Sequence, residues 1–139
     1  MKRRGFTLVE LLAVIVILGM IATVASISVF NVIESQKQEL LKEQISNLKD
    51  SAMSYYVKSK RFLTVCSISA TNETDDLNYM LELPPSDLSC GIVVRVEKLV
   101  SDGFFENRNH VCNEDKDVLI YRASQTDTRV YVPDDVCGS

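Results

Sequence analysis

Gly5-Phe6-Thr7-Leu8-Val9-Glu10-Leu11 is the stretch that decides how this chain is organised. It joins a basic leader, Lys2-Arg3-Arg4, to a run without any charged residue from Leu11 to Phe30. About 20 helical residues, at roughly 1.5 Å each, cross the hydrocarbon core of a bilayer. We therefore expect a membrane-spanning helix that begins here, with the basic leader in the cytoplasm and everything after Phe30 outside.

Glu10 is the unusual residue of this segment, because it is an acid close to the start of an apolar helix. A carboxylate at the centre of a membrane helix costs about 2.5–3.5 kcal/mol on insertion scales, and less near an end. If the leader is removed, the nearest cation is the new α-amine of Phe6, which is poorly placed on the same helix. The α-amine of a neighbouring chain, offset along the helix axis, is better placed. Glu10 therefore predicts a partner molecule.

The residues from Gly5 to Leu11, with the apolar span that follows, resemble the processing site of type IV pilins and the related pseudopilins of secretion and competence systems. The resemblance implies that a membrane prepilin peptidase cuts between Gly5 and Phe6 and N-methylates the amine of Phe6. It also implies that Glu10 guides the docking of a new subunit by neutralising that amine on an adjacent one. The likeness is close up to Phe30 and loose over the remainder.

Two plainer interpretations compete for the same segment. A secretory signal has an apolar stretch of about 7–15 residues before a small-residue cut site. The run here is longer, contains Glu10, and offers only the weak triplet Thr23-Val24-Ala25 as a cut site. An uncleaved membrane anchor explains the span, but it leaves Gly5, Phe6 and Glu10 without a purpose.

We expect one helix from about Phe6 to about Lys60, since neither glycine nor proline interrupts the chain from Met20 to Leu83. Its second half has an apolar stripe at spacings of three and four, with a solvated face between. A coiled-coil dimer is the alternative, but the stripe covers only about two heptads, which favours packing against a head. The stripe comprises Leu41, Ile45, Leu48, Ala52 and Tyr55, and the solvated face comprises Lys42, Glu43, Asn47, Lys49 and Asp50.

The remainder of the chain predicts a small antiparallel sheet. β-Branched and apolar runs indicate strands, polar clusters indicate loops, and a short helix is expected to end at Gly103. We expect a polar loop over 71–76, a turn over 84–87, a strand over 92–94, a helix through Val96, Leu99, Val100 and Phe104, and strands over 118–121 and 129–132 that pair through the turn 124–128 and end before Pro133.

The expected fold class is α+β, a long helix packed by its second half on a small antiparallel sheet, as in pilins. Residues 1–5 form a cleaved leader and residues 6–30 the transmembrane, filament-core half of the helix. Residues 31–61 form its amphipathic half, and residues 62–139 a globular extracellular head.

All four cysteines, Cys66, Cys90, Cys112 and Cys137, lie in the expected head. An even number outside the cell indicates two disulfides, for which three connectivities are possible. The expected hairpin brings Cys112 toward Cys137, which leaves Cys66 to reach Cys90. Each loop of about 25 residues contributes about 3–4 kcal/mol in chain-entropy models. The pilin resemblance implies that the 112–137 loop is a contact surface.

Catalytic, cofactor and metal chemistry finds little support in the sequence. The cysteine intervals exceed those of zinc sites, and C-x-x-C is absent. His110, the single histidine, is interpreted as a loop residue, and the sequon Asn72-Glu73-Thr74 is given no role. Because we find no Ser/His/Asp order, no phosphate loop and no convincing carboxylate pair, we expect no enzymatic activity and no cofactor.

The charge balance bears on possible partners. The formal net charge is −4, and loss of the three basic leader residues takes it to −7. Such an acidic exterior argues against non-specific nucleic-acid binding. Nucleic acid is therefore expected as a partner only in a competence system.

The pilin resemblance implies a structural subunit that assembles from the membrane into a type IV pilus for adhesion, motility or aggregation. The alternative is a pseudopilin of a type II secretion or competence system, and a less favoured one is an extracellular binding or enzymatic domain on a plain anchor. The implied partners are the prepilin peptidase, other copies and related pilins, membrane lipid before assembly, and the pilus assembly machinery. The implied location is a single-pass membrane protein with an extracytoplasmic head, then a cell-surface filament.

Overall fold

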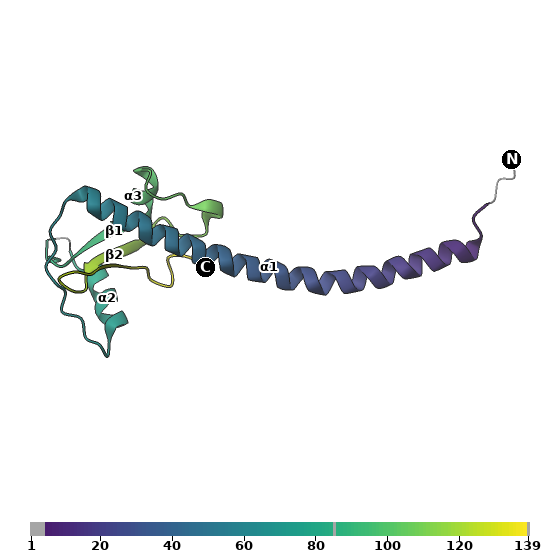
Figure 1. Ribbon diagram of the computed structural model, residues 1–139, viewed down its shortest axis with the longest axis horizontal. Helices are drawn as coiled ribbons and strands as arrows, with labels where there is room; N and C mark the ends of the chain where they lie inside the picture. Colours follow the sequence, from purple (N-terminus) through teal and green to yellow (C-terminus); the bar gives the residue numbers. More distant parts are fainter. Residues whose placement is uncertain (1–4, 85, 139) are drawn as a thin grey trace. The chain divides into compact units, whose positions relative to one another are not determined.

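The computed structural model describes residues 5–84 and 86–138, without the side chains of 24–28, so that Lys2, Arg3 and Arg4 of the leader lie outside the described residues. The chain divides into two units, Met1–Glu39 and Leu40–Ser139, which are treated separately. The elements, labelled in Figure 1, are α1 (Leu8–Ser59), α2 (Glu73–Glu82), β1 (Gly91–Arg95), α3 (Val96–Ser101), the 3-10 turn η1 (Arg108–His110), β2 (Asp117–Arg122) and β3 (Thr128–Tyr131).

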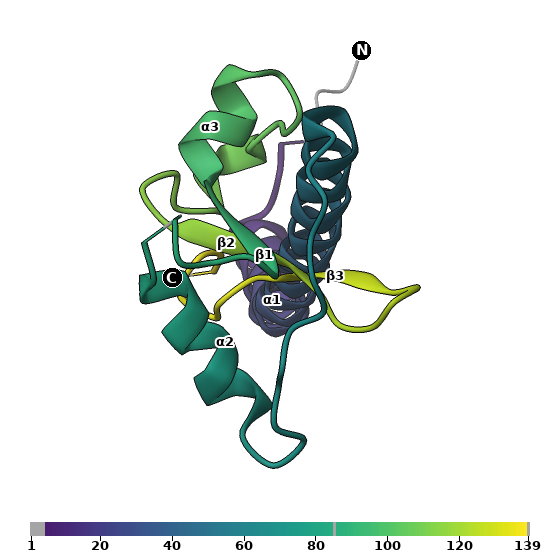
Figure 2. The ribbon, with the colours of Figure 1, turned by 90° about the vertical axis from the view of Figure 1, so that its left-hand side faces the viewer.

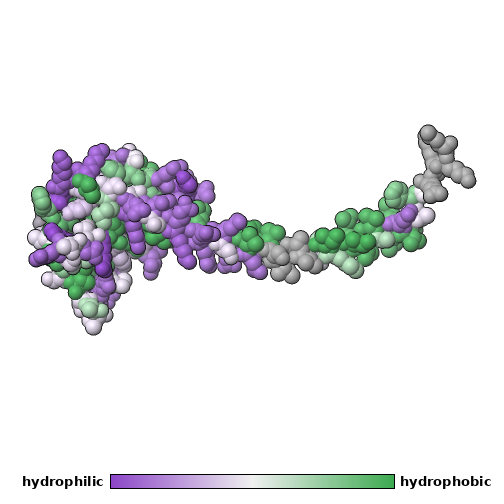
Figure 3. All heavy atoms as spheres, in the orientation of Figure 1, coloured by the Kyte–Doolittle hydropathy of each residue, from purple (hydrophilic) through white to green (hydrophobic). Residues whose placement is uncertain are grey.

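The first unit is the N-terminal part of α1. This helix confirms the expectation of a single helix from about residue 6 to about residue 60. Its described apolar side chains are exposed, and Figure 3 shows hydrophobic residues gathered on this part of the chain. Within the described residues, no helix is long and apolar enough to cross a membrane. The expected span over 6–30 includes the side chains of 24–28, which lie outside the described residues.

The second unit has three layers, with the sheet between the later part of α1 and α2 (Figure 2). The sheet is antiparallel in the order β1-β2-β3. Because successive side chains of a strand point to opposite faces, β2 serves both layers. Val118 and Ile120 belong to the cluster that packs on α1, whereas Leu119 and Tyr121 belong to the cluster that packs on α2. The expected hairpin of β2 and β3 is confirmed, and β1 adds a third strand.

The amphipathic half of α1 supplies one wall of the core. Leu48 and Ala52 are completely buried, and the other three residues of the expected stripe pack against the same cluster. All five residues of the expected solvated face are exposed. The stripe therefore packs on the sheet of its own chain. Gln44 is also completely buried, and its amide has no hydrogen-bond partner among the described residues.

The expected polar loop over 71–76 is wrong, because α2 begins at Glu73. Its first turn carries Glu73, Asp75 and Asp76, acids that are stabilised by the positive end of the helix dipole. The helix then buries Leu77 and Met80 against the sheet. The first turn of α2 is thus polar, and its buried apolar residues begin only at Leu77.

The short elements around the sheet agree with the expectations. Gly103 has a φ of 77° after α3, its N–H donates to Val100 O at 3.1 Å, and the Phe104 N–H donates to Leu99 O at 2.9 Å. This pair of bonds is the Schellman motif, which satisfies the last carbonyls of a helix. The turn over 84–87 is closed by Asp87 N–H donating to Pro84 O at 2.9 Å, with Pro85 outside the described residues.

We predict that Leu48→Ala destabilises the head by about 2–5 kcal/mol, because it leaves a cavity between α1 and the sheet. Lys49→Ala, the exposed neighbour, is the matched control and should change stability by less than about 0.5 kcal/mol. Denaturant unfolding of the full-length protein, followed by the near-ultraviolet circular dichroism of its tyrosines, measures the difference. Equal stabilities for the two variants would contradict the packing described here.

Candidate processing and docking site at the N-terminus

The peptide bond between Gly5 and Phe6 lies outside helical structure. Residues 5–7 have no regular structure, and α1 begins at Leu8. The Phe6 side chain is 81% exposed, and no atom beyond the neighbouring residues lies within 4 Å of a Cβ built on Gly5. Exposed, irregular backbone is the kind of segment that a peptidase cleaves. The two residues expected to flank the cut are therefore accessible in this chain.

Thr7 and Glu10 form a capping box at the start of α1. The Glu10 N–H donates to Thr7 Oγ1 at 3.3 Å, and the Thr7 N–H donates to Glu10 Oε2 at 3.3 Å. The Thr7 hydroxyl also lies 3.3 Å from Oε2, and Thr7 O accepts the first helical bond, from Leu11 N–H at 3.2 Å. Each residue satisfies a backbone donor of the other, which is how this motif begins a helix.

The Glu10 carboxylate is therefore only partly used within its own chain. Both hydrogen bonds from Thr7 end on Oε2, and among the described residues Oε1 accepts none. In the same part of the chain no cation lies within ion-pair distance of the carboxylate. Among residues 5–84 and 86–138, one Glu10 oxygen caps the helix while the other oxygen and the negative charge have no partner. Pairing with the Phe6 amine of a second chain stays a prediction.

The role of Thr7 was not anticipated from the sequence. The signal was present, since threonine followed three residues later by glutamate, directly before an apolar run, is typical of a capping box. The energetic cost of a carboxylate in an apolar layer predicts a role for Glu10 but none for Thr7. Thr7 is the residue that holds it at the first turn.

All four cysteines are bonded, in the pairs Cys66–Cys90 and Cys112–Cys137. The pairing expected from the hairpin is confirmed, because β3 runs back along β2 and brings the two flanking cysteines together. Cys112 and Cys137 are buried and also form an isolated β-bridge. These bonds tie the ends of the 112–137 loop, which contains β2 and β3.

The ends of this loop are packed closely against α1. Gly138 follows the disulfide with a φ of 95°, and a Cβ built there would lie 2.8 Å from Cδ2 of Leu41. Its N–H donates to Val111 O at 3.0 Å. Asn107 accepts from Cys112 N–H at 3.1 Å and donates to Cys112 O at 2.7 Å. The loop as a contact surface for other subunits remains a prediction.

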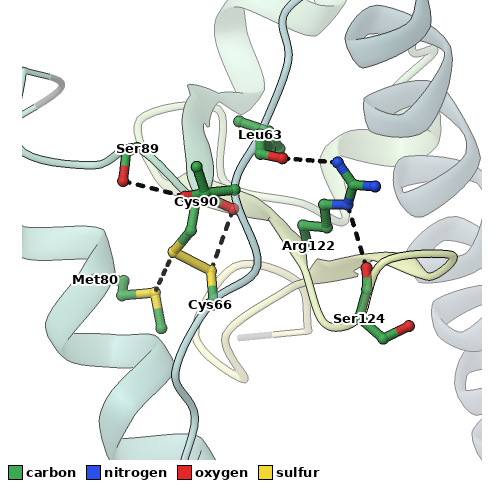
Figure 4. The surroundings of a disulfide bond; sticks show 8 residues. Leu63, Cys66, Met80, Ser89, Cys90, Arg122 and Ser124 are labelled. Atoms are coloured by element: carbon green, nitrogen blue, oxygen red, sulfur yellow. Dashed lines mark hydrogen bonds between the residues drawn. A yellow bond between two sulfur atoms is a disulfide. The ribbon is translucent and has the colours of Figure 1, made fainter.

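The other disulfide joins the segment after α1 to the sheet, as Figure 4 shows. The Cys66 N–H donates to Arg122 O at 2.9 Å. The Arg122 guanidinium in turn donates to Leu63 O at 2.8 Å and to Ser124 O at 3.2 Å. The Met80 sulfur of α2 lies 3.9 Å from the Cys90 sulfur. The chain that leaves α1 is thus fastened to the end of β2 by Arg122 and to the start of β1 by the disulfide.

No arrangement suited to a metal ion is present among the residues that the structure describes. His110 is exposed and lies 3.9 Å from a carboxylate oxygen of Glu114. It belongs to η1, next to the left-handed residue Asn109.

Comparison with known proteins bears on the N-terminus. Residues 1–26 match the family model described as the prokaryotic N-terminal methylation motif, which is the prepilin signal of type IV pilins and pseudopilins. No curated protein and no solved structure matches the chain. The chain therefore carries a prepilin signal, and the matched range contains the exposed Gly5–Phe6 bond and the capping box. Cleavage at that bond and methylation of Phe6 stay predictions.

We predict that Thr7→Val weakens the start of α1, because it removes the hydroxyl that accepts from Glu10 N–H. The expected loss is about 1 kcal/mol, which makes exchange of the Glu10 amide proton about fivefold faster. Thr7→Ser keeps the hydroxyl and is the control. Hydrogen–deuterium exchange of the full-length protein in micelles, read by NMR, measures both. Identical exchange in the two variants would show that the capping box does not form.

Proposed function

We propose that this protein is a structural pilin subunit. A prepilin peptidase removes residues 1–5 and methylates the amine of Phe6, and the subunit then passes from the membrane into a type IV pilus. Before assembly, the apolar half of α1 is held in lipid with the head outside. After assembly, that half of the helix lies in the filament core.

This proposal rests on the two oxygens of the Glu10 carboxylate: Oε2 caps α1, whereas Oε1 has no partner among the described residues. The methylation motif supports processing at Gly5 and Phe6, and the capping box holds Glu10 one turn further along α1. An acid with a free oxygen in an apolar setting is stabilised by a cation. The α-amine of a processed neighbour is such a cation. It lies four residues before that neighbour's own Glu10, so a neighbour offset along the helix axis brings its amine level with the carboxylate.

The docking step follows from this arrangement. In a subunit waiting in the membrane, Thr7 supplies hydrogen bonds to Oε2 but no charge. When the subunit meets the growing end of a filament, the Phe6 amine of an adjacent copy approaches Oε1 and neutralises the carboxylate. The capping box need not break, because a different oxygen is used. The helix therefore keeps its first turn while it acquires the ion pair.

The head acts as a structural and recognition module in this proposal, without a catalytic role. Most of its buried apolar side chains pack in two hydrophobic clusters, and its cysteines form disulfides. A pseudopilin of a secretion or competence system is the second candidate, because the methylation motif is shared by both classes.

Mass spectrometry of the mature protein tests the processing step. The expected first residue is N-methylated Phe6, with residues 1–5 absent. An intact Met1, or a first residue at Ser26 as for a conventional signal peptide, would contradict the proposal. Expression in a strain without prepilin peptidase is the control, and it should leave the leader attached.

Two substitutions of Glu10 separate helix capping from charge pairing. Glu10→Gln keeps an acceptor for the Thr7 N–H, since glutamine also serves at this position of a capping box, but it removes the charge. Glu10→Ala removes both. We expect both variants to enter the membrane normally, and both to lose filament incorporation by more than about tenfold, because the amine loses its counterion.

The amount of each variant in sheared filaments, relative to the membrane pool, is the measurement. If Glu10→Gln assembles as well as the unchanged protein while Glu10→Ala fails, the carboxylate serves only as a cap, and the proposed pairing with the amine is wrong.

A further inference from the structure

A basic and aromatic segment covers the end of α1 and the three residues directly after it. It reads Val57-Lys58-Ser59-Lys60-Arg61-Phe62, and it is called the basic segment below. Phe62 is 98% exposed and Val57 is 68% exposed, although the next residue, Leu63, is only 5% exposed and enters the core. The core of this chain therefore makes no use of the Phe62 ring.

The cations of the basic segment form no ion pair with the described part of their own chain. Across residues 5–84 and 86–138, no carboxylate lies within ion-pair distance of Lys58, Lys60 or Arg61. Lys58 instead lies with its ammonium 5.2 Å from the centroid of the Phe104 ring. An exposed aromatic residue beside arginine is the composition that protein interfaces favour.

The outer side of α2 is acidic, in contrast to the basic segment. Asp75, Tyr79 and Glu82 follow one another at spacings of four and three, so they share one side of the helix. All three are exposed, and Tyr79 is 63% exposed. Leu77 and Met80 occupy the side that packs on the sheet. An aromatic ring between two acids thus mirrors the composition of the basic segment.

A further acid from another part of the chain lies beside this side of α2. The Tyr131 hydroxyl donates to Asn78 Oδ1 of α2 at 2.9 Å, and Asp134 follows Tyr131 by three residues. Burial raises the pKa of Tyr131, and the negative charges of Asp134, Asp135 and Asp75 also raise it, against the lowering by the Asn78 hydrogen bond. Asp135 is paired with Lys116, whereas Asp75 and Asp134 have no cation within ion-pair distance in the described part of the chain. Asp75, Tyr79, Glu82 and Asp134 are called the acidic face.

The two surfaces are suited to meet between copies. The basic segment belongs to the α1 layer, α2 forms the layer on the other side of the sheet, and no described ion pair joins them within one head (Figure 2). A contact between two different patches is heterologous, so each copy keeps one free patch for the next. Such contacts extend into open helical filaments when the rotation does not close a ring.

We propose that the basic segment of one copy docks on the acidic face of a second copy, with Phe62 beside Tyr79. This inference rests on the proposed function, because it names a contact between heads in the filament. A polyanion such as nucleic acid is disfavoured as the occupant. Residues 40–139 carry 11 lysines and arginines against 16 aspartates and glutamates, a net charge of −5 that repels it.

Photo-crosslinking in assembled filaments tests the contact directly. The photoreactive amino acid p-benzoyl-phenylalanine replaces Phe62 in the full-length chain, and the crosslinked peptides are identified by mass spectrometry. The expected product joins position 62 of one copy to residues 75–82 of another. The same amino acid at Thr126, in the exposed turn between β2 and β3, is the control and should not label residues 75–82.

The outcomes separate this contact from the proposed function. Filaments with N-methylated Phe6 but without the crosslink, or with position 62 joined to nucleic acid or a different protein, overturn the head contact and leave the subunit role intact. If Phe6 is unmethylated and no filaments form, the proposed function fails and the contact fails with it. A crosslink from position 62 to residues 75–82 of a second copy, with no such crosslink from position 126, supports the contact.

Charge reversal provides a second, independent measurement. Lys60→Glu with Arg61→Glu should lower filament incorporation by about tenfold, since two attractive pairs become repulsive. Adding Asp75→Lys and Glu82→Lys inverts both surfaces of the chain, so copies become complementary again and incorporation should recover. Lys42→Glu with Lys49→Glu makes the same charge change at exposed positions of α1 and should have little effect. An equal loss in this control, or no recovery in a correctly folded four-fold variant, contradicts the contact.

Discussion

Burial of Leu48 and Ala52 against the sheet is the contact on which the head depends. These two α1 residues are fully enclosed, and the strand residues that meet them, Val118 and Ile120, are equally inaccessible. A sheet of three short strands with one uncovered apolar face is unstable in water, because that face gains stability only when it is removed from solvent. The helix that begins just after the expected cleavage site therefore also completes the core.

The N-terminus shows how one carboxylate can serve two purposes. Glu10 closes a capping box with Thr7 through a single oxygen, and its charge remains without a cation in the described chain. A helix beginning in an apolar layer has unpaired N–H groups at its first turn, and these need acceptors as much as the acid needs a cation. Inside the subunit, the Glu10 side chain accepts a hydrogen bond from a backbone N–H at the helix start. In our proposal, the same carboxylate pairs with a cation of another subunit. The capped helix start is compatible with the subunit alone and with the subunit in a filament.

The parts of the head that could be predicted have strong local signals. Val93 and Val94 lie in a β-branched run, Gly103 ends α3 with the left-handed dihedrals that glycine allows, and the turn before β3 separates two apolar runs. The pairing of Cys112 with Cys137 then followed from the hairpin between them. Helix α2 was missed because its first turn is polar and its buried side consists of little more than Leu77 and Met80, too few residues to show a period. Its helical state depends on the sheet that it covers.

By itself, the sequence determined the prepilin signal, the long helix with its change from apolar to amphipathic, and the strands, because each of these depends on residues close together along the chain. Only the tertiary structure decided that α2 forms a third layer, that Arg122 fastens the segment after α1, and that Phe62 is left outside while Leu63 is buried. These outcomes depend on which distant segments meet, and burial is defined only once they have packed. The surfaces available to other copies are what this packing leaves exposed, so they too are decided at the tertiary level.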